Sequence, residues 1–307
     1  MGELSIRPLE PERELDEFLA VFNQGRVRAL SRDQWLEFEA RSAGHGLHRR
    51  LAGRSTGAVV TVGTVDDDPF TSGGVMVWIA TGPEHRCQGH GRAMLAAVER
   101  VLAERRPAEA RAGIRDDDPE SRAWAERRGF AVYDHTFASR LDLATFDPAP
   151  HRYAVERAVA AGLRFARFGP GDDADRLYEL YGRLLRDAPD QLEPPDRAYF
   201  QREMVERPGA IMVLAYAGDE PVGLAMLLPR QGGVYGNAIT GVLPDHRGRG
   251  LARALKVVGA EAARAAGGLT VVTGNNARNA PMLAVNAALG YRREAGILHL
   301  HRRTPTV

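Results

Sequence analysis

The chain has few of the residues that would tie it to an oxidising compartment, a membrane or a polyanion. Its single cysteine, Cys87, excludes an intrachain disulfide and fits a reducing cytoplasm, which is where we expect the protein. No apolar run is long enough to span a bilayer, so we expect no membrane partner. Lys256 is the only lysine. With 41 basic and 40 acidic residues the formal net charge is +1, which argues against a nucleic-acid partner held by bulk electrostatics.

A length of 307 residues exceeds what one hydrophobic core needs and suits two domains of about 150 residues each. The clearest break in composition is Asp147-Pro148-Ala149-Pro150, which is typical of a linker. We therefore predict an N-terminal domain over residues 1–147, a linker with a short connecting helix over 148–162, and a C-terminal domain over 163–307. We expect a monomer or a homodimer.

A glycine-containing loop occurs twice, each time between an apolar strand and a helical pattern. The two copies are Pro83-Glu84-His85-Arg86-Cys87-Gln88-Gly89-His90-Gly91 and Pro244-Asp245-His246-Arg247-Gly248-Arg249-Gly250-Leu251-Ala252. Small residues in such a turn leave N–H groups bare at the positive end of a helix dipole, where they favour an anion such as a diphosphate. A lone loop of this kind is equally compatible with an ordinary strand-to-helix turn.

The spacing of the two loops indicates a duplicated domain. Arg86 and Arg247 are 161 residues apart (247 − 86), and so are Gly129-Phe130 and Gly290-Tyr291 (290 − 129). Two markers with one offset mean that the whole unit is repeated. In each half the pattern predicts a strand, two helices, three strands, a helix, a strand, a helix and a closing strand, with residues 132–143 closing the first sheet and 298–301 the second. This is an α/β fold with a mixed, mostly antiparallel sheet and helices on both faces.

The order of these elements and loops resembles the GNAT superfamily of acyl-CoA-dependent N-acyltransferases, and it does so in both halves, as in a tandem-GNAT protein. The resemblance implies acetyl-CoA, or another acyl-CoA, as cofactor and the amine of a small molecule as acceptor. In the second half it assigns CoA binding to Thr240, Val242, Arg247, Gly248, Arg249, Gly250, Leu251, Ala252 and Asn279. In the first half the matching residues are Ile79, Thr81, Arg86, Cys87, Gln88, Gly89, His90 and Gly91.

Both halves depart from the family at the position of its usual general acid, a tyrosine that protonates the leaving thiolate. Ala125 occupies this position in the first half and Asn286 in the second. Alanine cannot donate a proton, whereas asparagine can still donate a hydrogen bond. The first half also has Asp118 where the second has Asn279. We therefore expect the second domain to be the catalytic one, with Asn286 as a catalytic candidate.

The general base is not distinguished by any spacing. An alkyl amine has a pKa of about 10, so a base must take its proton before it attacks. Tyr235 is our candidate among residues that border the expected acceptor groove, and the others are Asp187, Glu193, His299 and His301. We expect no metal, since Asp66-Asp67-Asp68 is more typical of a solvated turn. Two alternatives stay open: a catalytically silent CoA-binding scaffold, and an acyltransferase with a non-CoA donor such as aminoacyl-tRNA.

Overall fold

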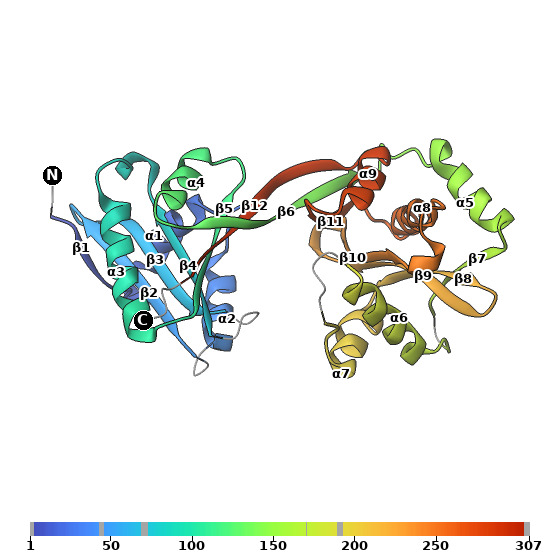
Figure 1. The fold of residues 1–307 in the computed structure, drawn as a ribbon, viewed down its shortest axis with the longest axis horizontal. Helices are drawn as coiled ribbons and strands as arrows, with labels where there is room; N and C mark the ends of the chain where they lie inside the picture. Colours follow the sequence, from blue (N-terminus) through green and yellow to red (C-terminus); the bar gives the residue numbers. More distant parts are fainter. Residues whose placement is uncertain (1–2, 43–45, 69–72, 170, 189–192, 304–307) are drawn as a thin grey trace. The chain divides into compact units, whose positions relative to one another are not determined.

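The computed structural model describes residues 3–42, 46–68, 73–169, 171–188 and 193–303 (Figure 1). It divides into two compact units, unit 1 with Met1–His135 and Ala295–Val307, and unit 2 with Thr136–Glu294. In the described part of the chain, no helix combines the length and the apolar character needed to cross a membrane.

Unit 1 has its strands in the order β1-β2-β3-β4-β5-β12. Its elements are β1 (Ser5–Pro8), α1 (Pro11–Gln24), α2 (Arg32–Ser42), β2 (His48–Ser55), β3 (Ala58–Asp67), β4 (Gly74–Thr81), η1 (Pro83–His85), α3 (His90–Arg105), β5 (Glu109–Arg115) and α4 (Pro119–Glu126). Only β4 and β5 pair in parallel, and the other described pairs are antiparallel.

Unit 2 has the order β6-β11-β10-β9-β8-β7. Its elements are η2 (Ala149–His151), α5 (Arg152–Ala160), β7 (Leu163–Arg167), α6 (Ala174–Arg186), α7 (Arg197–Phe200), η3 (Gln201–Val205), β8 (Ile211–Ala217), β9 (Glu220–Pro229), η4 (Gln231–Gly233), β10 (Val234–Val242), η5 (Pro244–His246), α8 (Leu251–Ala265), β11 (Thr270–Asn276) and α9 (Ala280–Ala288). Here β10 and β11 form the parallel pair.

Helices cover both faces of each sheet, as predicted. In unit 1, Val62 and Val65 are three residues apart on β3 and so point to opposite faces. Val62 packs in a cluster with residues of α1, and Val65 in a cluster with residues of α3. In unit 2, a Cβ built on Gly241 would lie 2.9 Å from Leu184 of α6, and one on Gly223 would lie 2.9 Å from Leu255 of α8. These glycines let the two helices approach the strands closely. The mixed, two-faced α/β fold is confirmed.

Two strands pair where the sequence did not predict. The strand β6 (Ala131–Asp142) pairs antiparallel with β11 through residues 136–142, and β12 (Arg292–Arg303) pairs antiparallel with β5 through residues 297–303. The prediction that each half closes its own sheet with these strands was wrong. Because the halves are copies, β5 and β11 offer similar edges, and an alternating apolar pattern does not specify which closing strand pairs with which edge.

The predicted turn over the three aspartates was also wrong, because β3 continues through Asp66 and Asp67. Asp67 accepts a hydrogen bond from the Leu47 N–H at 2.9 Å and pairs with Arg105 at 3.1 Å. Asp66 lies 2.7 Å from both His48 and Arg50. Cationic neighbours on adjacent elements therefore allow these carboxylates to remain in the strand.

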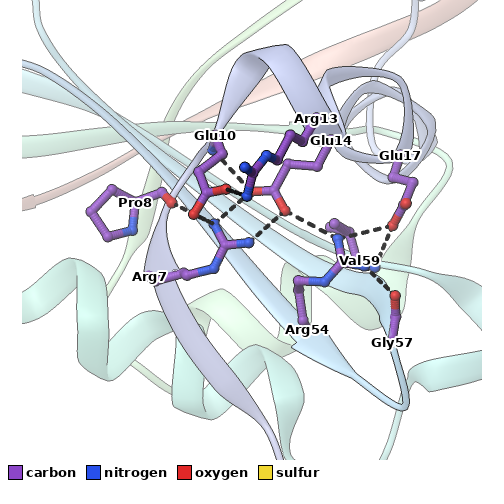
Figure 2. Close-up of polar contacts among 9 residues, drawn as sticks. All are labelled: Arg7, Pro8, Glu10, Arg13, Glu14, Glu17, Arg54, Gly57 and Val59. Carbon is purple, nitrogen blue, oxygen red and sulfur yellow. Dashed lines mark hydrogen bonds and ion pairs between the residues drawn. The ribbon is translucent and has the colours of Figure 1, made fainter.

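A buried carboxylate ties α1 to the edge of the sheet in unit 1 (Figure 2). Glu14 is 3% exposed, and its two oxygens accept from both terminal nitrogens of Arg7 at 2.9 Å and from Arg54 at 3.0 Å. The Glu10 N–H donates to it as well, at 2.9 Å. Burial alone raises the pKa of Glu14, but the Glu10 N–H and the guanidinium groups of Arg7 and Arg54 outweigh it, so the pKa lies below its usual value.

The only lysine is buried in unit 2. Lys256 on α8 is 4% exposed, its Nζ has no hydrogen-bond partner among the described residues, and it lies 5.0 Å from the ring centroid of Tyr291. Burial lowers its pKa to about 7. Between pH 7 and the ordinary value of 10.5, the unfolded chain therefore binds more protons than the folded one, so stability rises with pH across this window and is lowest below it.

Replacing Lys256 with methionine should therefore stabilise the protein. We expect Lys256→Met to raise the free energy of unfolding at neutral pH by about 1–4 kcal/mol, because it removes a desolvated charge and keeps the volume. It should also remove the rise in stability toward alkaline pH. Lys256→Arg, which stays charged at every pH tested, should lower the free energy of unfolding and should likewise show no rise toward alkaline pH. Urea denaturation at neutral and alkaline pH measures both effects, and a destabilising methionine at neutral pH would contradict the prediction.

Candidate active site

In unit 2 the two parallel strands part toward the glycine loop. β10 pairs with β11 from Val234, opposite Thr270, to Asn237, opposite Thr273. Across the described strands, residues 239–242 of β10 and 274–276 of β11 have no mutual pairs. The edge of β10 that leads into the loop is therefore left with backbone groups that an extended ligand could pair with.

A β-bulge lies where the strands begin to part. The pairing of β10 with β9 shifts register between Asn237 and Ile239, so that Ala238 is skipped. A bulge leaves backbone groups unpaired and turns them out of the ladder, which is common beside active sites. Thr240 is anchored next to it, since its hydroxyl donates to Asn237 Oδ1 at 2.9 Å.

The first half has the parting strands but not the bulge. β4 pairs with β5 only from Gly74 to Val77. Its pairing with β3 continues without a shift from Val75 to Thr81, so Ile79 and Thr81 sit in a regular ladder. The Thr81 hydroxyl is also engaged by Thr61, at 2.9 Å. The two halves therefore differ at the strand before the loop, where β10 has a bulge and β4 has none.

The second loop is open and its N–H groups are bare. Gly248 and Gly250 have φ values of +73° and +82°, in the left-handed region that side chains disfavour, and Gly250 begins α8 without a side-chain cap. Among the described residues, the N–H groups of residues 248–252 donate to no protein acceptor. A Cβ built on Gly248 would meet no atom within 4 Å. Free N–H groups, open space and a helix N-terminus fit a diphosphate.

The loop is held in place through Arg247. Its Nε donates to the Val242 carbonyl at 2.8 Å, and its Nη2 pairs with Asp187, which follows α6. The rest of the predicted loop starts α8, where Leu251 is 2% exposed and Ala252 is partly buried. Asp187, a candidate base, is thus engaged with the loop instead. Both arginine contacts fix where the bare N–H groups point.

The first loop has the same backbone with different side chains. Gly89 has φ +88°, and Cys87 has φ +59°, where Gly248 of the second loop has +73°. Cys87 is exposed and takes a conformation that costs a residue with a Cβ about 1 kcal/mol. Arg86 Nε lies 3.5 Å from the Thr81 carbonyl, longer than the matching contact of Arg247.

The remaining residues of the first loop have partners of their own. Gln88 donates to the Glu84 carbonyl at 3.0 Å. His90 is 8% exposed and occupies the buried first position of α3, which Leu251 occupies in α8. A Cβ on Gly91 would lie 3.4 Å from the Thr81 hydroxyl. The first loop thus differs from the second mainly in its side chains, since among the described residues the N–H groups of 87–91 also donate to no backbone acceptor.

The side chains of Asn279 and Asp118 cap the helices that follow. Asn279 Oδ1 accepts from the Met282 N–H at 3.3 Å, and Asp118 Oδ1 accepts from the Ser121 N–H at 3.0 Å. Both residues are therefore N-caps. Asparagine keeps an amide N–H for a ligand while its oxygen caps the helix, whereas an ionised aspartate has no donor to offer.

Asn286 is buried and oriented by Asn275 of β11. Asn275 donates to the Phe137 carbonyl at 3.2 Å and to the Ser139 hydroxyl at 2.9 Å, which fixes its amide nitrogen on that side. Its Oδ1 therefore faces Asn286, whose Nδ2 donates to it at 2.7 Å. The Asn286 Oδ1 is buried and has no partner in the described structure. The Asn286 oxygen is therefore a free acceptor, and a donor role for this residue would need the second N–H of its amide.

The other candidate bases lie in the core of unit 2, on its surface, or in unit 1. Tyr235 is 7% exposed in the core of unit 2, seven positions before Val242 on the same strand, which is about 23 Å of extended chain. Glu193 is exposed and pairs with Arg186 at 3.5 Å. His299 and His301 are on β12 in unit 1, where His301 lies 3.2 Å from Glu109. The burial of Tyr235 and its distance along the strand argue against it as the base for this loop.

Arg157 at the end of α5 is a residue that the sequence did not point to. Its Nη2 donates to the Arg249 carbonyl at 2.6 Å and would lie 3.0 Å from a Cβ on Gly250. A Cβ on Gly89, at the matching place in the first loop, would meet nothing within 4 Å. Because α5 has no counterpart in the first half, the repeat gave no signal for this arginine.

The fold and loops place the chain in a known class of proteins. The family model "Acetyltransferase (GNAT) family" matches residues 12–130 and 174–291, once in each half. The chain belongs to this family and is a tandem-GNAT acetyltransferase, as the resemblance implied.

Two relatives that align with most of the chain are named as acetyltransferases. A mycothiol acetyltransferase of Streptomyces scabiei is 27% identical over 236 residues, which are 74% of this chain and 70% of that protein. A mycothiol acetyltransferase of Clavibacter michiganensis is 31% identical over 226 residues, 73% of this chain and 69% of that protein. These relatives support an acyl-CoA-dependent N-acetyltransferase over the silent scaffold and the non-CoA donor.

Solved structures share the fold. A tandem GNAT protein from the clavulanic acid biosynthesis pathway aligns with a TM-score of 0.67 and 21% identity, covering 99% of this chain and 100% of that one. A GCN5-related N-acetyltransferase from Sphaerobacter thermophilus aligns with a TM-score of 0.69 and 17% identity over 99% and 97% of the two chains. The tandem arrangement of two such folds is thus confirmed.

Proposed function

We propose that the second half of the chain transfers the acetyl group of acetyl-CoA to the primary amine of a small molecule by direct attack, and that the first half is structural. The observation that carries the proposal is the combination, found in unit 2, of a bare glycine loop, parting strands and a β-bulge. Unit 1 has the first two and lacks the third at the matching position. Relatives named for mycothiol support a small-molecule acceptor.

In this proposal the loop binds the diphosphate and the strand binds the arm that carries the acetyl group. The N–H groups of residues 248–252 would hold the diphosphate, with Arg247 keeping the loop in position. The edge of β10 from Thr240 to Val242 and the amide of Asn279 would bind the extended arm. When bound, acetyl-CoA supplies the thioester carbonyl that the amine attacks.

Two groups at the parting strands would assist the transfer, in which the proton of the amine passes to water and the thiolate leaves. A backbone N–H beside Ala238 would stabilise the negative charge that develops on the carbonyl oxygen. The buried, unpartnered Oδ1 of Asn286 would accept a hydrogen bond from a donor in the crevice and so position it. A thiolate with a pKa of about 8.5 leaves without a dedicated acid, so the missing tyrosine slows the reaction without preventing it.

Release of free thiol from acetyl-CoA tests the proposal. The purified chain is incubated with acetyl-CoA and a panel of small primary amines, including amino sugars and aminoacyl amides, and thiol is measured with and without each amine. We expect at least one amine to raise thiol release well above buffer. If the chain binds CoA in calorimetry but no amine raises turnover, the silent scaffold replaces our proposal; if CoA does not bind, the assignment of the loop fails.

Removal of the Arg157 side chain should weaken donor binding. We expect Arg157→Gln to raise the Kd for CoA about fivefold and to reduce its dependence on salt, because an exposed guanidinium beside a diphosphate contributes about 1 kcal/mol. The matched control is Arg152→Gln on the same helix, which removes a surface pair with Glu261 and should leave the Kd unchanged. Calorimetric titrations with CoA at two salt concentrations give the Kd of each variant. Equal changes in Kd for Arg157→Gln and Arg152→Gln would contradict the prediction.

A further inference from the structure

Unit 1 contains a cavity that the proposed reaction does not use. It has a volume of about 470 Å³, which is within the range of small-molecule sites, and lies between α1, α2 and the face formed by β2, β3 and β4. Four aromatic rings line it, those of Phe22, Trp35, Phe38 and Trp78, together with the guanidinium groups of Arg26 and Arg50. We call it the aromatic cavity.

The charge of Arg50 is already compensated. Its Nη2 lies 2.7 Å from Glu39 Oε1 and 2.7 Å from Asp66 Oδ1, and its Nε donates to Glu39 at 2.8 Å. The contacts of Nη2 are ion pairs without hydrogen-bond geometry, since this atom is buried and makes no hydrogen bond in the described structure. Asp66, which also lines the cavity, is engaged by His48 at 2.7 Å as well. Arg50 therefore has its counter-charges without a ligand.

The charge of Arg26 is not compensated. Among the described residues, no carboxylate lies within 4 Å of its guanidinium, which contacts the Arg28 carbonyl at 3.3 Å. The guanidinium carbon lies 5.1 Å from the ring centroid of Phe22 and 5.4 Å from that of Trp78. Burial lowers the pKa of Arg26, because the charged form has lost part of its hydration. A half-buried cation whose described contacts are two ring faces and one carbonyl favours an anion.

A second polar group of the aromatic cavity is also without a partner. Trp78 Nε1 is buried and makes no hydrogen bond in the described part of the chain. A buried indole N–H ordinarily finds an acceptor. The Arg26 guanidinium and the Trp78 N–H can therefore both donate to an acceptor on a ligand. The acids of the cavity already have donors, because Asp66 is paired and Glu37 is exposed and has contacts of its own.

We propose that the aromatic cavity binds a small aromatic carboxylate, whose ring lies among Phe22, Trp35 and Phe38 and whose carboxylate pairs with Arg26. The planar guanidinium matches a carboxylate in two parallel hydrogen bonds, and the apolar walls match a flat ring. An amine ligand would place a second cation against Arg26. The site is distinct from the glycine loops, although β4 leads from Trp78 to the first of them.

Three probes with one ring and different charge test the proposal: phenylacetate, its neutral isostere phenylacetamide, and phenethylamine. Two of the three tryptophans of the chain line the cavity, so their emission reports binding directly, and Trp124→Phe removes the third. We expect phenylacetate to shift the tryptophan emission saturably and to bind about tenfold more tightly than phenylacetamide. Phenethylamine should bind most weakly.

The variants then assign the preference to Arg26. Arg26→Gln should bind phenylacetate and phenylacetamide equally, Arg26→Lys should keep part of the difference, and Arg28→Gln, two residues away and exposed, should keep all of it. Far-UV circular dichroism and the melting temperature show that each variant is folded. No saturable shift with phenylacetate, tighter binding of phenethylamine, or an unchanged preference in folded Arg26→Gln would each overturn the proposal. Because acetyl transfer is not measured, these outcomes are independent of the proposed function.

Discussion

Gly250→Glu is expected to lower kcat/KM for acetyl-CoA by at least about 1,000-fold and to abolish CoA binding. The new carboxylate would lie at the N-terminus of α8, where the N–H groups of residues 248–252 would donate hydrogen bonds to it instead of to a diphosphate. Its negative charge would also repel the ligand. Steady-state kinetics and calorimetry measure the two effects.

Two matched variants separate charge from backbone strain. Gly250→Ala places a residue with a Cβ in the same left-handed conformation as Gly250→Glu but adds no charge. It should therefore lower stability but keep most of the activity. Gly89→Glu introduces the same charge at φ +88° in the first loop, where a Cβ has open space, and should leave turnover within about threefold of the parent. An equal loss from Gly89→Glu and Gly250→Glu would show that both halves take part in the reaction.

Removal of the buried carboxylate of unit 1 should have the largest effect on stability. We expect Glu14→Gln to lower the free energy of unfolding by about 3 kcal/mol, because it removes the buried carboxylate that Arg7 and Arg54 share and leaves them only the half-exposed Glu10 and Glu17 as counter-charges. For a unit of this size the melting temperature should fall by about 6–12 °C. The control is Glu17→Gln, whose carboxylate is half exposed, accepts from Val59 N–H and Arg54, and should cost about 1 kcal/mol or less.

The same carboxylate predicts a dependence on pH. The pKa of Glu14 is lower in the folded than in the unfolded chain, so the unfolded chain binds the proton first as the pH falls. The stability that Glu14 contributes is therefore present above the usual value of 4.5 and is lost as the pH falls below it toward the folded pKa. Glu14→Gln should unfold with a weaker acid dependence than the parent. An unchanged acid dependence in the variant would contradict this.

Local features of the fold could be predicted because neighbouring residues determine them. The spacing of Ser31 and Gln34 is that of a capping box, and the structure forms it at the start of α2: the Gln34 N–H donates to Ser31 Oγ at 3.2 Å and the Ser31 N–H donates to Gln34 Oε1 at 3.0 Å. The backbone of the two loops repeats at the predicted spacing, even where Cys87 replaces glycine. Turn and cap chemistry needs only a few adjacent side chains, so the sequence specifies it directly.

Features that depend on distant partners could not be predicted. Nothing near β12 in the sequence shows that it pairs with β5, since the repeat offers two similar edges. The orientation of Asn286 depends on Asn275, and that of Asn275 on a carbonyl of Phe137, which belongs to the other sequence repeat. Tyr235 was a candidate because its segment was expected to border the acceptor groove, and the structure gives it a packing role.

A crystal structure of the chain with CoA tests the proposed donor site most directly. We expect diphosphate oxygens within hydrogen-bond distance of the N–H groups of residues 248–252, and the extended arm beside β10 between Thr240 and Val242. CoA bound at residues 86–91 alone, or a second loop that remains empty at saturating CoA, would contradict the proposal that the second half holds the acetyl donor.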